Sequence, residues 1–218
     1  MTSLPPASFA ELSPDTVLDA LQSLNLHGDG RLLALNSYEN RVYQVGMDGT
    51  SPVIVKFYRP GRWTDAAIRE EHQFVDALHA REIPVVPAMR IENDTLQVHE
   101  GYRFAVFPRQ GGRAPELDRD ETLEQMGRLM GRIHAVGADS SYQHRPALDV
   151  TTFGDEPRAW LLVHDFIPPD LLASWQSVTA QAIDSVRHCY ERAGTLRYLR
   201  LHGDCHGGNV LWTDDGPH

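Results

Sequence analysis

Two runs of β-forming residues on either side of a short turn constrain the fold of this chain more than any other feature. Residues 41–45 alternate between polar and apolar side chains, as a strand with one buried face does. Residues 51–58 form a second β-rich run, and the Asp48-Gly49 step between the two runs is typical of a hairpin turn. A further apolar run, residues 32–35, precedes them. We therefore expect an antiparallel sheet in the N-terminal part of the chain.

A single charged residue, Lys56, lies inside the second of these runs. A lysine is seldom buried unless its charge is paired, so it is either a sheet-edge residue with its ammonium in water or a phosphate-binding lysine that pairs with a helix glutamate. The helix expected from Thr64 onward, which Ile83-Pro84 should end, offers Glu70 and Glu71. Glu71 is favoured because it lies one turn from Phe74 on the expected buried side, but Glu70 is also within a turn of Phe74. A solvated helix face would explain either glutamate.

The clearest candidate boundary follows the last β-rich run. Residues 102–108 end in a proline and pass into the Gly-rich segment 109–113, which suits a hinge between two lobes, although a surface loop would have the same composition. We expect residues 1–108 to form one lobe, built on the sheet and one helix, and residues 109–218 to form a mainly helical lobe. The expected fold class is therefore α+β and two-lobed.

Apolar residues recur at helical spacing in three stretches of the second half, at about residues 121–137, 156–164 and 170–192. A short amphipathic helix is also expected near the N-terminus, where Ser13 precedes Pro14. Side chains of the last two helices that we expect to be buried are Trp160, Leu171, Trp175, Val178 and Ile183.

Composition excludes several classes of partner. The chain has 218 residues and a net charge of -10, which would repel nucleic acid. No apolar run reaches the ~20 residues that a membrane span requires, and the N-terminus lacks a signal sequence. The two cysteines, Cys189 and Cys205, have no motif spacing, as in a reducing compartment. We expect a cytoplasmic protein, and a monomer.

The segment from Leu201 to Trp212 carries the chemistry. Asp204 and Asn209 lie five positions apart on a Gly-rich turn between apolar runs. This is the spacing of a kinase catalytic loop, in which the aspartate accepts a hydroxyl proton and the asparagine holds Mg²⁺. Two other interpretations stay open. The alternation of His202, Asp204 and His206 could make a metal site, and the whole segment could be a polar turn with a structural histidine.

A nucleotide would need further contacts, and the sequence offers them in two places. The turn at residues 36–41 precedes the first hairpin strand, where the Ser37 hydroxyl and turn N–H groups could donate to phosphates; an ordinary turn explains the same residues. Backbone groups around Phe107 and Arg109, at the candidate hinge, could bind an adenine ring.

Several separated motifs together resemble a known family. Taken as a set, Lys56, Glu71, the hinge and the Asp204–Asn209 loop resemble the aminoglycoside phosphotransferase-like kinases, which have a protein-kinase-like fold. The closer resemblance is to the bacterial stress response kinase A family, through the following segments: Leu35–Tyr43, Val55–Pro60, Glu70–Phe74, Phe104–Pro108 and Leu201–His206. The resemblance implies ATP- and Mg²⁺-dependent phosphorylation of protein Ser or Thr hydroxyls. It implies Asp204 as proton acceptor, Asn209 as Mg²⁺ ligand and Ser37 at the ATP site.

One departure from the family pattern matters. The family has a second Mg²⁺-binding aspartate on the strand after the catalytic loop, and this sequence stops at His218 before that position; Asp215-Gly216 instead favours a hairpin turn. The helical lobe would then be incomplete, and we expect this chain alone to have little or no activity. Two alternative functions stay open: phosphorylation of a small-molecule alcohol, and a nucleotide-binding, pseudokinase-like module.

Overall fold

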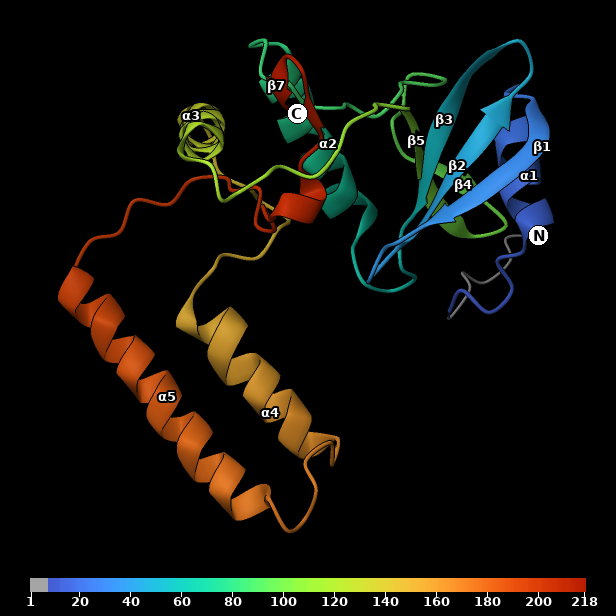
Figure 1. Cartoon of the computed structure of the whole chain (residues 1–218). Coiled ribbons are helices and arrows are strands. Elements are labelled where there is room, and N and C mark those ends of the chain that lie inside the picture. Colours follow the sequence, from blue (N-terminus) through green and yellow to red (C-terminus); the bar gives the residue numbers. More distant parts are fainter. Residues whose placement is uncertain (1–7) are drawn as a thin grey trace. The chain divides into compact units, whose positions relative to one another are not determined.

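The computed structural model describes residues 8–218 of the chain (Figure 1). It divides into two compact units. The first contains the residues up to His144 together with Leu199–His218, and the second is Arg145–Tyr198. The catalytic-loop segment therefore belongs to the same unit as the N-terminal sheet. The expected lobe boundary after Pro108 divides the chain at another place, and it stays a prediction.

The first unit is built on a five-stranded antiparallel sheet, which confirms the expected sheet and hairpin (Figure 1). The spatial order is β1-β2-β3-β5-β4. Met47 pairs with Thr50, so Asp48 and Gly49 form the turn, and Gly49 has φ +67°, which glycine adopts without strain. The strands are β1 (Gly28–Leu35), β2 (Arg41–Met47), β3 (Thr50–Phe57), β4 (Gln97–His99) and β5 (Tyr102–Pro108).

The core of the sheet lies on the face toward helix α1 (Pro14–Gln22). The Ser13 hydroxyl caps this helix by accepting the Thr16 N–H, as expected from the Ser-Pro start. Phe57 and Phe104 are fully buried and stack with ring centroids 5.2 Å apart. Because side chains alternate along a strand, burying Phe57 on this face puts Lys56 on the opposite one.

Helix α2 (Asp65–His79) begins where expected, with Thr64 as its N-cap, but it ends before the predicted Ile83-Pro84 stop. Glu82 has φ +56°, and the Ile83 N–H donates to the Leu78 carbonyl at 3.1 Å. The turn that closes the right-handed helix α2 therefore contains a residue in the left-handed conformation, Glu82. Leu78 and Ile83 belong to one buried cluster, and this apolar contact accompanies the ending. The proline lies beyond this ending and does not cause it.

Helix α3 (Asp120–Gly137) packs on α2, through Leu129, Ile133 and Val136 against Phe74 and Leu78. Its last residue meets the strand-like segment that leads into the catalytic loop, since the Arg200 N–H donates to the Gly137 carbonyl at 3.1 Å. The chain then forms a short 3₁₀ turn (Gly207–Asn209) and the hairpin of β6 (Trp212–Thr213) and β7 (Gly216–Pro217), which confirms a turn near Asp215.

The close approach at Gly137 yields a testable prediction. A Cβ atom at this position would overlap the Arg200 carbonyl oxygen, so G137A is expected to lower the free energy of unfolding by about 1–3 kcal/mol. The matched control is G131A in the same helix, where a Cβ meets no atom within 4 Å and should stabilise by up to about 1 kcal/mol. Urea unfolding measures both. Equal effects of the two substitutions would contradict the packing described.

The second unit is a helical hairpin of α4 (Glu156–Val163), preceded by a π-helical turn (Thr151–Asp155), and α5 (Leu172–Ala193) (Figure 1). Arg158 donates to the Thr179 hydroxyl at 3.0 Å, and Arg187 pairs with Asp155 at 3.1 Å. None of the helices within residues 8–218 combines the length and the hydrophobicity that a membrane span needs.

The expectation that five side chains of this hairpin are buried was wrong. The exposed fractions are 50% for Trp160, 54% for Leu171 and 65% for Val178, while Trp175 and Ile183 are only half-buried. Two helices cover one side of each other, so an apolar stripe wider than that side stays uncovered within the unit. Periodicity identifies the apolar stripe of a helix but does not identify what covers it.

Candidate functional site

Lys56 is the only lysine in the sequence, and it lies on a central strand. In the sheet it stands between Val42 of β2 and Ala105 of β5, so the alternative of an edge lysine was wrong. Its ammonium forms an ion pair with Glu71 of α2 at 3.3 Å and lies 4.8 Å from the centre of the Tyr58 ring. The lysine is therefore held between a carboxylate and an aromatic face.

The two neighbouring glutamates of α2 have different partners. Glu71 reaches Lys56, which confirms the favoured pairing. Glu70 instead accepts the backbone N–H groups of Gln143 and His144, the latter at 2.9 Å. Glu70 thus holds the segment after α3, while Glu71 orients the lysine. A role of Lys56 in binding phosphates stays a prediction.

Asp204 and Asn209 lie together on the loop. The Asn209 Nδ2 donates to the Asp204 carboxylate at 3.0 Å and to its carbonyl at 2.8 Å. The 3₁₀ turn folds the chain back and so brings the two side chains into contact across five positions. Both bonds use Nδ2, so the Asn209 Oδ1 takes no part in them, and a side-chain amide oxygen is a kind of ligand that Mg²⁺ accepts. These residues fit a magnesium ion at the loop.

His202 orders the start of this loop. Its Nδ1 accepts the Asp204 N–H at 3.3 Å, as the interpretation of a structural histidine requires. Partial desolvation lowers the pKa of His202 although part of its side chain meets solvent, against the opposing effect of the Asp204 charge.

The alternative of a metal site built on His202, Asp204 and His206 finds no support in the geometry. Within residues 8–218, no three His, Cys, Asp or Glu side chains gather as metal ligands. His206 uses its Nδ1 to accept the Gly208 N–H at 3.1 Å, and its Nε2 lies 3.8 Å from Asp204. The ring therefore orders the turn that carries Asn209.

The other residues expected to bind a nucleotide, Ser37, Phe107 and Arg109, each contact another residue of the protein. The Ser37 hydroxyl donates to the Asn40 carbonyl at 2.6 Å, so a phosphate would have to replace that bond. Phe107 turns its ring toward His72 from β5, and the Arg109 Nε donates to Gln44 at 3.0 Å. The roles of Ser37, Phe107 and Arg109 stay predictions.

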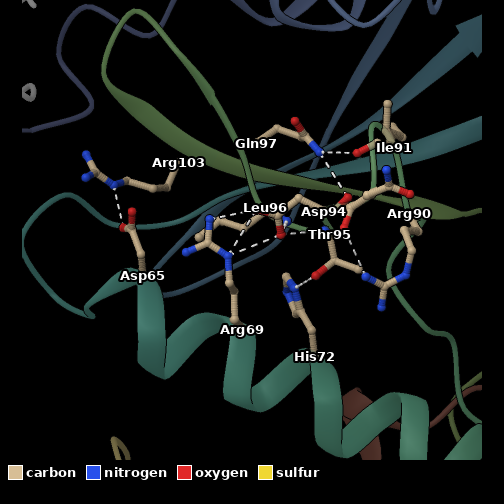
Figure 2. Close-up of polar contacts among 11 residues, drawn as sticks. Asp65, Arg69, His72, Arg90, Ile91, Asp94, Thr95, Leu96, Gln97 and Arg103 are labelled. Carbon is tan, nitrogen blue, oxygen red and sulfur yellow. Dashed lines mark hydrogen bonds and ion pairs between the residues drawn. The ribbon is translucent and has the colours of Figure 1, made fainter.

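Sequence reasoning missed a stripe of polar residues along α2. Asp65 pairs with Arg103 at 2.8 Å and Arg69 with Asp94 at 2.7 Å (Figure 2). Asp76 pairs with Arg90 at 3.1 Å. His72 lies among them on the same helix face and is only 3% exposed. The spacing of positions 65, 69, 72 and 76 is that of one helical face, and this pattern could have revealed the stripe.

Comparison with known proteins shows the family to which this chain belongs. Residues 31–218 match the family model described as "Phosphotransferase enzyme family". The chain is 42% identical over 210 residues to stress response kinase A of Escherichia coli O157:H7, and 40% identical over 210 residues to a Salmonella typhimurium protein named serine/threonine protein kinase RdoA. Each alignment covers 96% of this chain and 63% of the relative, so the chain spans less than two thirds of these curated relatives.

Solved structures with a similar fold include two small-molecule kinases. One is the microcompartment-associated aminopropanol kinase, with a TM-score of 0.69 and 22% identity over 89% of this chain and 64% of that chain. Another is amicoumacin kinase hAmiN in complex with AMP-PNP, Ca²⁺ and Ami, with a TM-score of 0.68 and 19% identity over 93% of this chain and 61% of that chain. At these identities the likeness shows the protein-kinase-like fold alone. With this fold, the match over residues 31–218 and the paired Asp204 and Asn209, the chain belongs to the phosphotransferase enzyme family.

Proposed function

We propose that this chain carries the nucleotide-binding and catalytic-loop part of an ATP- and Mg²⁺-dependent kinase that phosphorylates Ser or Thr hydroxyls of proteins in the cytoplasm. The observation that carries the proposal is the Lys56–Glu71 pair, 3.3 Å apart, in the same compact unit as a loop whose Asp204 and Asn209 side chains are in contact at 3.0 Å. The name of one relative, serine/threonine protein kinase RdoA, supports a protein substrate over a small alcohol.

In this proposal four residues divide the tasks. Bound Mg-ATP supplies the phosphoryl group and neutralises part of its charge. Lys56 binds nonbridging phosphate oxygens, and Glu71 keeps its ammonium oriented. The Asp204 carboxylate accepts the proton of the attacking hydroxyl, and Asn209 would hold the metal ion through its side-chain oxygen. The Asn209 amide, by donating to Asp204, fixes the rotamer of that carboxylate.

Binding of Mg-ATP tests the nucleotide part of the proposal. K56M is expected to weaken binding by about 10–100-fold, because one charge-assisted contact contributes roughly 1.5–3 kcal/mol. The matched control is R128M, which removes the same charge from an exposed arginine of α3 that pairs only with Glu124 among the contacts of the described residues. Titration calorimetry measures all three proteins. Equal affinities of K56M and the unchanged chain would refute the assignment.

The substrate class needs a separate experiment. Incubation of a version extended to the full length of the curated relatives, with labelled ATP and either a panel of serine- and threonine-containing proteins or a panel of amino alcohols, separates the two kinds of kinase. We expect transfer to protein hydroxyls, lost on treatment with a protein phosphatase. Transfer only to the alcohols would reassign the substrate while leaving the nucleotide site intact.

A further inference from the structure

His72 directly follows Glu71 on α2, and both nitrogens of its ring form hydrogen bonds. Its Nε2 is 2.7 Å from the Tyr58 hydroxyl, and its Nδ1 is 2.8 Å from the Thr95 hydroxyl. Tyr58 and Thr95 are 3% and 5% exposed, so water does not compete for these bonds. A hydroxyl can donate or accept, so both bonds form whichever nitrogen carries the proton. The three side chains make one buried chain of hydrogen bonds.

Both groups that hold the Lys56 ammonium are attached to this chain. Tyr58 presents its ring to the ammonium at 4.8 Å while its hydroxyl bonds His72. Glu71, the ion-pair partner at 3.3 Å, directly precedes His72 on α2. A rotation of α2 that moved the Glu71 carboxylate would therefore also pull the His72 ring away from its two hydroxyl partners.

Further contacts hold Thr95 in position. Its N–H donates to the Asp94 carboxylate at 2.8 Å, and Arg69 holds the same carboxylate with a further contact at 2.7 Å (Figure 2). Arg69 lies one turn before His72 on α2 (Figure 2). The connections close a loop from α2 through Arg69, Asp94 and Thr95 back to His72, and this loop limits the rotation of the helix about its axis.

The ring is uncharged near neutral pH. Burial and, to a smaller extent, the Lys56 charge lower the pKa of His72 to about 4, against the effect of Asp76 and Asp94. A neutral imidazole places no second positive charge beside the ammonium of Lys56. Its polar contacts can therefore hold Tyr58 and α2 in place without repelling the lysine.

We infer that His72 is a positioning residue for Lys56, acting through the Tyr58 hydroxyl and the Thr95 hydroxyl to fix the ring and the carboxylate that hold the ammonium. The importance of this ammonium rests on the proposed function, but its position does not. Since Lys56 is the only lysine, protein grown with isotope-labelled lysine gives one side-chain NMR signal from the chain, without nucleotide and without assignment by mutagenesis.

The test compares variants that each remove one hydroxyl. Y58F keeps the ring beneath the ammonium, T95V keeps the shape of Thr95, and T95S restores a hydroxyl. E71Q gives the signal of a lysine that lacks its ion pair. The matched control is T16V, which removes a buried hydroxyl bonded to Ser13 at 3.0 Å on α1 and does not touch the lysine.

Y58F and T95V are expected to move the lysine signal toward its position in E71Q, while T95S and T16V leave it unchanged. A purely structural network would lower the melting temperature of Y58F and T95V, as of T16V, and leave the signal in place; that result would overturn the inference. If one variant does not fold, the other decides. Failure of the unchanged protein to bind Mg-ATP would refute the proposed function, yet the lysine signal would still test the role of His72.

Discussion

In a version extended to the full length of the curated relatives, D204N is expected to lower the rate of phosphoryl transfer to a protein hydroxyl by about 10²–10⁴-fold, the usual contribution of a positioned general base. The amide of the new side chain keeps an oxygen that can accept the Asn209 Nδ2 bond now made at 3.0 Å, so the loop should keep its shape. It lacks the negative charge that takes up the hydroxyl proton. Single-turnover transfer from labelled ATP measures the loss.

The matched control for this substitution is D215N, which makes the same change of charge in the turn of the β6–β7 hairpin. It should leave transfer unchanged. D204N should also bind Mg-ATP nearly as well as the unchanged chain, because the missing charge acts on the hydroxyl. If D204N transferred phosphate as fast as D215N, Asp204 would not be the proton acceptor, and the loop would have to be reinterpreted.

The stability of the protein should fall steeply between pH 6.5 and pH 4 because of His72. The pKa of this ring is about 4 in the folded chain, while an ordinary histidine has 6.5, so in this window the unfolded chain binds a proton that the folded chain does not. Stability is then unaffected by His72 above pH 6.5 and decreases as the pH falls. The full loss is about 3 kcal/mol at 1.36 kcal/mol per pKa unit.

Urea unfolding at a series of pH values, on the unchanged chain and on H72N, measures this contribution. The comparison uses the slope against pH, because H72N also loses a buried ring and should be less stable throughout. Asp94 does not affect the slope between pH 6.5 and pH 4. Its contact with Arg69 lowers its pKa from 3.8 to about 2, so its contribution to the free energy of unfolding is lost only below pH 4. His202 has a lowered pKa in both proteins and cancels. Parallel slopes would contradict the buried, neutral state of His72.

Features set by a few adjacent residues were predictable. The Asp48-Gly49 turn, the Ser13 and Thr64 caps and the alternation that puts Lys56 opposite Phe57 all follow from local geometry, and the structure contains each of them. The proximity of Asp204 and Asn209 also follows from local geometry, because only a short turn separates them.

Features that depend on distant partners were not predictable in the same way. The end of α2 at His79 is set by a backbone turn at Glu82 and by apolar contact within the core, and a proline in the sequence pointed to the wrong residue. The exposed side chains of the second unit show the same limit, since burial depends on a neighbouring surface and not on the pattern of one helix.

The sequence by itself determined the antiparallel sheet, the strand that carries the only lysine and the loop with its aspartate and asparagine, because each of these depends on backbone preferences over a few residues. Only the tertiary structure decided that Glu71 rather than Glu70 meets Lys56, and that His72 joins Tyr58 to Thr95. These three contacts join residues 14, 15 and 23 positions apart in the sequence. Their formation depends on how α2 packs on the sheet.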